Sequence, residues 1–153
     1  MIRLGVVGHS GYEGLTAVLA RLTEAAARLG IEPYFEKDLL PFVPGGKSLE
    51  KPASIDALLT LGGDGTLLRG ARLIASHQVP ILGVNMGRLG FLTCCGVDQF
   101  VEALDHLARK EYKVEQRMGL VASIDRQSGA VRESWIALND VVVHKGGVAR
   151  IAS

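Results

Sequence analysis

The segment Leu61-Gly62-Gly63-Asp64-Gly65-Thr66 constrains the fold of this chain more than any other part of its sequence. Residues 55–61 form a short apolar run of strand length, and residues 67–74 carry the apolar spacing of a helix. The segment therefore predicts a strand that passes through a glycine-rich turn into a helix. At this end of a strand in an open α/β sheet, the N–H groups of the helix favour an anion, so the turn is a candidate phosphate site.

The residue types of this turn suit phosphate chemistry. Glycine lets the backbone approach phosphate oxygens without a Cβ in the way, and it permits the positive φ angles that a nest of amides requires. Asp64 could act as a general base toward a hydroxyl, as a metal ligand, or as an acceptor that orients a sugar hydroxyl. A tight loop in which Asp64 caps the helix is the simpler alternative, but three glycines exceed what a cap needs.

The first 112 residues alternate strand and helix patterns, which predicts a parallel α/β domain built from right-handed crossovers. We expect Gly30 to end the first helix and Asp98 to cap the last one. The expected strands are residues 1–8, 33–36, 55–61 and 80–84, the expected helices are 12–29, 67–74 and 98–110, and the expected surface loop is 37–54.

From Lys113 the apolar period changes to two, which is typical of half-buried strands. Residues 114–125 and 131–144 read as strands, and a third strand begins before the chain stops at Ser153. We therefore expect an α/β nucleotide-binding domain at residues 1–112 and the first strands of an incomplete β-rich domain at 113–153. Two or three strands cannot bury one apolar face alone, so we expect their open edges to favour self-association.

Composition agrees with a soluble intracellular enzyme, and we expect the protein to be cytoplasmic and to act on small-molecule substrates. The 153 residues carry a formal net charge of +1 without a stripe of Lys and Arg, which argues against nucleic acid as a partner. No apolar run reaches the length of a membrane span, and the N-terminus lacks the pattern of a signal peptide. Neither the adjacent Cys94 and Cys95 nor the four histidines have the spacing of metal ligands, so we expect no dedicated metal site.

Three motifs together resemble those of the NAD kinase family. Gly62-Gly63-Asp64-Gly65-Thr66 is similar to a signature shared by NAD kinases, diacylglycerol and sphingosine kinases and, more distantly, phosphofructokinases. Residues 85–92 resemble a second NAD kinase motif, and residues 138–144 resemble the Asn-Glu motif of that family. The three motifs stand in family order. The last one has Asp140 where the family usually has Glu, which keeps the carboxylate on a shorter side chain.

The resemblance implies a Rossmann-like, phosphofructokinase-like N-terminal domain followed by a β-rich NAD-binding domain. It implies transfer of the γ-phosphoryl group of ATP, or of a phosphoryl group from polyphosphate, to the 2′-hydroxyl of the adenosine ribose of NAD, which gives NADP. Mg²⁺ or another divalent cation is expected to accompany ATP. The full-length enzyme is expected to be a homo-oligomer. Because the β-rich part is incomplete, we expect residues 1–153 alone to have little activity.

The same resemblance assigns roles to individual residues. Asp64 would hold the 2′-hydroxyl and accept its proton, while the amides of the turn would face phosphate. The Asn-Asp pair would contact the adenosine of NAD, and two arginines would lie along the bound nucleotide. Phe91 would either contact the adenine or pack within the protein. The expected substrate contacts are Gly62, Gly63, Asp64, Gly65, Thr66, Arg69, Phe91, Asn139, Asp140 and Arg150.

Two other functions stay open at this point. A lipid kinase of the diacylglycerol or sphingosine kinase type shares the first motif convincingly, but not the second and third. A non-catalytic nucleotide-binding module would use the same turn without turnover. Assaying NAD against lipid alcohols separates the two kinases, and nucleotide binding without turnover would favour the module.

Overall fold

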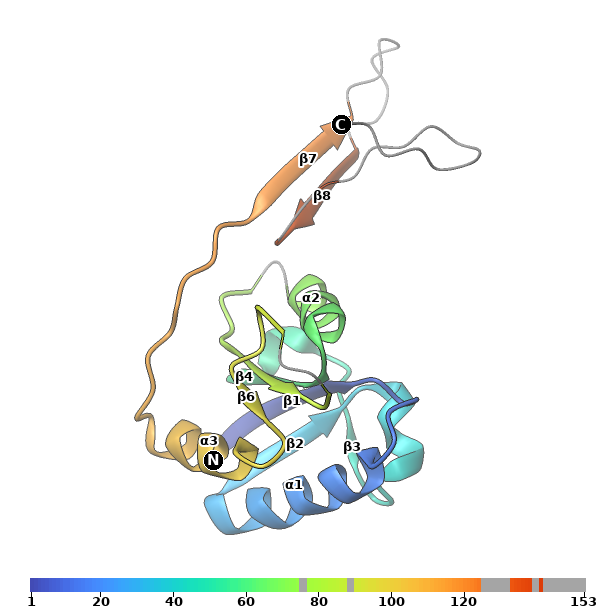
Figure 1. The fold of residues 1–153 in the computed structure, drawn as a ribbon, viewed down its shortest axis with the longest axis vertical. Helices are drawn as coiled ribbons and strands as arrows, with labels where there is room; N and C mark the ends of the chain where they lie inside the picture. The colour runs from blue at the N-terminus through green and yellow to red at the C-terminus, as the bar shows by residue number, and fades with distance from the viewer. Residues whose placement is uncertain (75–76, 88–89, 125–132, 139–140, 142–153) are drawn as a thin grey trace. The chain divides into compact units, whose positions relative to one another are not determined.

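The computed structural model describes residues 1–74, 77–87, 90–124, 133–138 and 141 (Figure 1). Within these residues, no helix is both long and apolar enough to cross a membrane. The chain divides into two compact units, Met1–Val114 and Glu115–Ser153, which are described separately below. The expected domain boundary falls at residue 112, close to this division. The assignment of the second unit to an incomplete NAD-binding domain stays a prediction.

A six-stranded parallel sheet forms the centre of the first unit. Its strand order is β3-β2-β1-β4-β5-β6, and each pair of neighbours is parallel. This arrangement confirms the α/β class that the alternating patterns predict. The strands are β1 (Ile2–Gly8), β2 (Ile31–Phe35), β3 (Lys47–Ser48), β4 (Ala57–Gly62), β5 (Ile81–Asn85) and β6 (Cys95–Gly96).

Helices cover both faces of this sheet. Helices α1 (Leu15–Leu29) and α3 (Phe100–Arg109) pack beside each other on one face, and α2 (Asp64–Leu73) lies on the other (Figure 1). Gly30 ends α1 as predicted, with a left-handed φ of 67° and an N–H that donates to the carbonyl of Ala26. The expectation that Asp98 caps α3 is wrong. The N-cap residue of that helix is Gln99, and the Gln99 side chain makes no capping hydrogen bond.

The pleat of the central strands divides the apolar core between the two faces. In β4, Leu59 and Leu61 belong to the larger cluster, which includes the apolar sides of α1 and α3. Leu58 instead belongs to a smaller cluster with Ile74, at the end of α2. All six residues of β4 are buried because both faces are covered. This burial explains why the sequence before the glycine turn is a continuous apolar run.

The expected surface loop at 37–54 is wrong in part. The segment contains two short 3₁₀ helices, η1 (Lys37–Phe42) and η2 (Pro52–Ser54), and between them β3 pairs with β2. Leu39 of η1 is fully buried and Val43 is buried in the same cluster, so apolar side chains anchor this proline-rich segment to the core. Strands β3 and β6 each contain two residues, which is too short for a periodic signal in the sequence.

Among the described residues, the second unit contains an antiparallel pair, β7 (Leu120–Ile124) and β8 (Glu133–Ala137). The period-two pattern therefore predicts the strands correctly. The first begins later than expected, since residues 111–119 form no regular element. Val121, Trp135 and Ile136 keep much of their apolar surface exposed. The expected third strand near Ser153 lies outside the described residues.

Helix α2 packs closely against β4 at Gly70, and this position provides a test of the packing. A Cβ at Gly70 would lie 2.8 Å from Thr60 Cγ2 and 2.9 Å from Leu58 Cδ2. Gly70→Ala should therefore push the helix from the sheet and lower the free energy of unfolding by about 1–3 kcal/mol, measured in urea.

Gly65→Ala in the same helix is the matched control. A Cβ at Gly65 would meet nothing within 4 Å. Because alanine is the better helix former, this substitution should be neutral or should stabilise the protein by up to about 1 kcal/mol. Equal losses of stability in the two variants would contradict the packing of α2 on β4.

Candidate functional site

The glycine turn lies at the point where the strand order of the sheet reverses. From β1 the chain continues to β2 and β3 on one side, whereas β4, β5 and β6 lie on the other side. The carboxyl ends of β1 and β4 therefore flank the switch point, which is where open α/β sheets bind their ligands. Two turns meet there, the one that follows β1 and the one that joins β4 to α2.

A cleft of about 540 Å³ opens at this edge of the sheet. The turn after β1 and the first turns of α2 provide most of its lining. The first N–H groups of a helix have no partner within the helix, and the helix dipole adds positive potential, so this end of α2 favours an anion. The lining residues are Gly8, His9, Ser10, Tyr12, Asp38, Gly63, Gly65, Thr66 and Arg69.

The glycines of the turn do not use positive φ angles, contrary to the expectation from the sequence. Among the described glycines, positive φ occurs at Gly14, Gly30 and Gly45 only. Gly62 is required for space instead, because a Cβ there would lie 2.2 Å from Thr66 Oγ1. At Gly63 and Gly65 a Cβ would meet nothing within 4 Å. The turn therefore joins a tightly packed strand end to an open backbone surface in the cleft.

Asp64 is the first residue of α2, and its carboxylate binds the backbone of another segment. Oδ2 accepts the N–H of Phe91 at 2.9 Å, and Oδ1 accepts the N–H of Leu92 at 3.0 Å. We call these two hydrogen bonds the Asp64 clasp. The helix-cap alternative is wrong, because α2 has no side-chain cap. A Cβ at Gly90 would lie 2.3 Å from Oδ1, so the clasp also needs a glycine there.

The clasp lowers the pKa of Asp64 below its ordinary value. The hydrogen bond from the backbone of Phe91 is the largest cause and lowers the pKa. Burial is the second-largest cause and opposes it, while the backbone of Leu92 and Thr93 lowers the pKa further. Asp64 is therefore ionised at neutral pH and holds a proton weakly. A carboxylate accepts about four hydrogen bonds, so the two amides leave capacity for a substrate hydroxyl. These properties suit the role of orienting a hydroxyl more than they suit the role of a strong general base.

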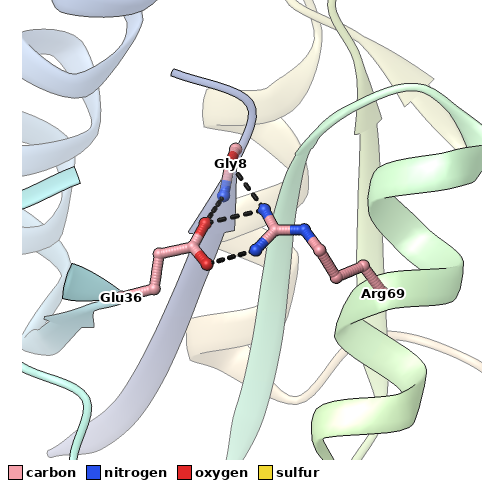
Figure 2. A network of polar contacts seen from close by, with 3 residues as sticks. All are labelled: Gly8, Glu36 and Arg69. Atoms are coloured by element: carbon pink, nitrogen blue, oxygen red, sulfur yellow. Dashed lines mark hydrogen bonds and ion pairs between the residues drawn. The ribbon is translucent and has the colours of Figure 1, made fainter. Parts of the chain in front are cut away.

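Arg69 is held by a network that joins β1, the end of β2 and α2 (Figure 2). Glu36 Oε1 accepts the N–H of Gly8 at 2.6 Å and Arg69 Nη2 at 2.8 Å, while Oε2 accepts Nη1. Nη2 also donates to the carbonyl of Gly8 at 2.6 Å. Glu36 raises the pKa of Arg69, so the guanidinium stays charged beside the cleft. Sequence reasoning missed Glu36, although its place at the carboxyl end of the expected strand 33–36 was an available signal.

The segment after β5 has its own internal support. Asn85 is buried, its Oδ1 accepts the N–H of Gly87 at 2.7 Å, and its Nδ2 donates to Thr93 Oγ1 at 3.2 Å. Phe91 lies in this segment with its side chain 95% exposed. Phe91 is therefore not packed against the described residues, and its contact with the adenine stays a prediction.

The structure brings the expected residues of the first motif and Arg69 to one sheet edge. Thr66 is buried against Gly62 and also borders the cleft. Asn139, Asp140 and Arg150 lie outside the described residues, so their expected contacts stay predictions. In the described part of the chain, no group of three His, Cys, Asp or Glu side chains gathers into a metal site.

Sequence comparison places these features in a known context. Residues 47–112 match the family model of the ATP-NAD kinase N-terminal domain. The NAD kinase of Gemmatimonas aurantiaca is 49% identical over 150 residues, which cover 98% of this chain and 52% of that protein. The NAD kinase of Geobacter sp. (strain M21) is 39% identical over 141 residues, covering 88% and 49%. The chain thus spans about half the length of the curated relatives it matches.

Solved structures confirm the α/β fold. The crystal structure of yeast NADH kinase complexed with NADH matches with a TM-score of 0.74 at 18% identity, covering 91% of this chain and 47% of that one. Because the two sequences are only 18% identical, this structural similarity shows a shared fold and carries no argument about function. An NAD kinase from Archaeoglobus fulgidus in complex with ATP matches with a TM-score of 0.58 at 26% identity, covering 80% of this chain and 42% of that one.

The Asp64 clasp makes stability depend on pH in a defined direction. The folded-state pKa of Asp64 lies below its unfolded value, so the clasp stabilises the fold above the unfolded pKa of about 4 and is lost as the pH falls through the folded one. Asp64→Asn cannot accept from both Phe91 and Leu92. At pH 7 this substitution should therefore lower the free energy of unfolding by about 1 kcal/mol, because solvent screens the partly exposed carboxylate.

Urea unfolding across the pH range tests this expectation, and the difference between wild type and Asp64→Asn should shrink below a pH of about 4. Asp105→Asn is a control, since Asp105 pairs with Arg109 on the exposed side of α3 and such a pair contributes about 0.5 kcal/mol or less. A difference for Asp64→Asn that stays constant from pH 7 to pH 3 would show that the carboxylate does not hold the segment as described.

Proposed function

We propose that this chain is part of an NAD kinase, as its similarity to that family supports, and that it contributes the donor-binding side of an enzyme that phosphorylates the 2′-hydroxyl of the adenosine ribose of NAD. The donor is ATP or polyphosphate, and the product is NADP. The observation that carries the proposal is the pairing of two features at one sheet edge. An anion-favouring cleft lies there, lined by Gly63, Gly65 and Arg69. Asp64 stands between the two glycines, and its carboxylate can still accept a hydrogen bond.

The cleft supplies charge and donors for the phosphate chain. Arg69 carries a guanidinium that stays ionised, and the first turn of α2 directs N–H groups toward an anion. His9 accepts the N–H of Gly11 through Nδ1 at 3.1 Å, which leaves the proton of its neutral ring on Nε2 as a further donor. Phosphoryl transfer passes through a loose transition state, so positioning and charge neutralisation supply most of the catalysis. The described residues of the cleft suit these two tasks.

Asp64 serves the acceptor in this proposal. Its carboxylate accepts a hydrogen bond from the 2′-hydroxyl and aims the hydroxyl oxygen at the γ-phosphorus. The hydroxyl proton passes to the carboxylate as the new P–O bond forms. The bond from the transferred phosphorus to the bridging oxygen of the donor breaks, and ADP or the shortened polyphosphate leaves with that oxygen. A loose transition state makes little demand on the strength of the base. The low pKa of Asp64 therefore agrees with the role. Phe91 donates its N–H to Asp64, so its exposed ring is available to the adenine of the same nucleoside.

The proposal includes groups that the described residues do not provide. Mg²⁺ or another divalent cation would enter on the phosphate oxygens of ATP, since the described residues form no cage of three acidic, His or Cys ligands. Asn139 and Asp140 would contact the adenosine, and Arg150 would lie along the nucleotide. We also infer that the reaction takes place in the cytoplasm in a homo-oligomer, and that residues 1–153 alone have little activity.

Asp64→Asn tests the acceptor role in the protein produced from its complete gene. NADP formation should fall about a hundredfold to ten-thousandfold in kcat, which is the usual cost of removing a positioned acid–base group. The KM for ATP should change little, because Asp64 faces the acceptor. Turnover near the wild-type rate would make Asp64 a structural residue only.

Gly90→Ala is the matched variant, because it disturbs the clasp but keeps the carboxylate. It should retain much more turnover than Asp64→Asn, whereas equal losses would mean that the position of the segment, and not the carboxylate, limits the rate.

The wild-type assay also separates the alternative functions. Phosphorylation of lipid alcohols without NADP would indicate a lipid kinase, and ATP binding without turnover would indicate a binding module.

A further inference from the structure

We propose that Glu36 is a positioning residue that aims the guanidinium of Arg69 at the phosphate chain of the donor. The inference rests on the proposed function, because it adds a residue to the donor side of the same cleft. Glu36 lies outside the motifs that resemble the NAD kinase family, and it does not line the cleft. Its effect on the donor would therefore pass through Arg69.

The Glu36 carboxylate takes the place of a missing strand neighbour. The parallel pairing of β1 with β2 ends at Val6 and Phe35, and the N–H of Glu36 donates to the carbonyl of Val6 at 2.9 Å. Beyond this point β2 no longer covers the edge of β1. The side chain of Glu36 turns back and accepts the N–H of Gly8 at 2.6 Å (Figure 2). The last residue of β1, which borders the cleft, is thereby fixed by a side chain.

Arg69 reaches the same carboxylate from α2, on the other side of β1 (Figure 2). The planar guanidinium meets both carboxylate oxygens, a geometry that lysine cannot reproduce. With the bond to the Gly8 carbonyl, these contacts use three of the five N–H donors of Arg69. Nε–H and the second Nη1–H are therefore the donors left for a phosphate oxygen. The Arg69 side chain is 49% exposed, so a ligand can reach it.

Glu36 and Arg69 differ in burial, and this difference gives them different roles toward a ligand. The Glu36 side chain is only 14% exposed, and its oxygens are used by Gly8 and Arg69, so little of its charge acts on a ligand. A free arginine side chain samples many rotamers, and ordering it on binding weakens affinity. Glu36 orders Arg69 before the donor arrives. Without Glu36, the charge would still be present but would no longer be aimed.

A purely structural role is the alternative to be separated. In that case Glu36 would only tie β2 to α2, and its loss would lower stability without a selective effect on the donor. Glu32, which lies on β2 four residues before Glu36, offers a matched control. It forms an ion pair with Lys47 at the edge of the sheet, and neither residue lines the cleft.

The experiment compares Glu36→Gln with Glu32→Gln in the protein produced from its complete gene. Glu36→Gln should raise the KM for ATP about tenfold, the usual scale for one charge-assisted hydrogen bond, while the KM for NAD changes less than about twofold. Glu32→Gln should leave both KM values unchanged. Equal changes in the two KM values, or a lower melting temperature with unchanged KM values, would overturn the proposal.

A double-mutant cycle adds a readout that a structural tie would not move. Arg69→Lys should raise the KM for ATP on its own, and adding Glu36→Gln should then have little further effect, because Glu36 acts through Arg69. Multiplicative effects on the KM would contradict this dependence. If Glu36→Gln fails to fold, Glu36→Asp keeps the charge with a shorter reach and should give a smaller rise in the KM for ATP. An unchanged KM in that variant would count against the proposal.

A binding measurement keeps this inference separate from the proposed function. If the wild-type protein forms no NADP, the proposed function fails, but inorganic tripolyphosphate can still be titrated by calorimetry. Glu36→Gln should then bind tripolyphosphate about tenfold more weakly than wild type and Glu32→Gln do. Equal affinities in the three proteins would overturn the role of Glu36.

Discussion

The rest of the site depends on the two hydrogen bonds that Asp64 accepts from Phe91 and Leu92. They connect the start of α2 with the segment after β5, so one carboxylate holds these two segments together. The clasp requires α2 to begin at Asp64, close against the end of β4, and Gly62 and Gly90 provide the necessary space. The glycines of this region therefore serve close approach between segments more than unusual backbone angles.

Two carboxylates at the same sheet edge have different capacities for a ligand. Glu36 is mostly buried, and a guanidinium and a backbone amide occupy its oxygens. Asp64 is partly exposed and meets only backbone N–H groups, so it can still accept a hydroxyl. The environments of the two carboxylates thus give them different roles. Glu36 orders the guanidinium of Arg69, and Asp64 can face the hydroxyl of the acceptor. This division of tasks is the physical basis of the proposed phosphoryl transfer.

The sequence predicts the features that depend on near neighbours, and it fails where distant residues meet. The strand, glycine turn and helix around Asp64 were predictable, because burial on both faces makes β4 continuously apolar. Strand β3 was not, since its two residues carry no period. The contacts of Glu36 join residues 28 and 33 positions apart, and the clasp joins residues 27 and 28 positions apart, so no local pattern contains them. The family resemblance singled out Asp64 without revealing its partners.

A crystal structure of the complete protein with NAD and a non-hydrolysable ATP analogue would show directly whether both substrates meet at this sheet edge. We expect the phosphate chain to lie in the cleft against the first turn of α2, with an oxygen within hydrogen-bond distance of Arg69. We also expect the 2′-hydroxyl of NAD to donate to the carboxylate of Asp64 while the bonds from Phe91 and Leu92 persist. A phosphate chain bound away from the carboxyl ends of β1 and β4, or a 2′-hydroxyl out of reach of Asp64, would contradict the proposed roles of Arg69 and Asp64.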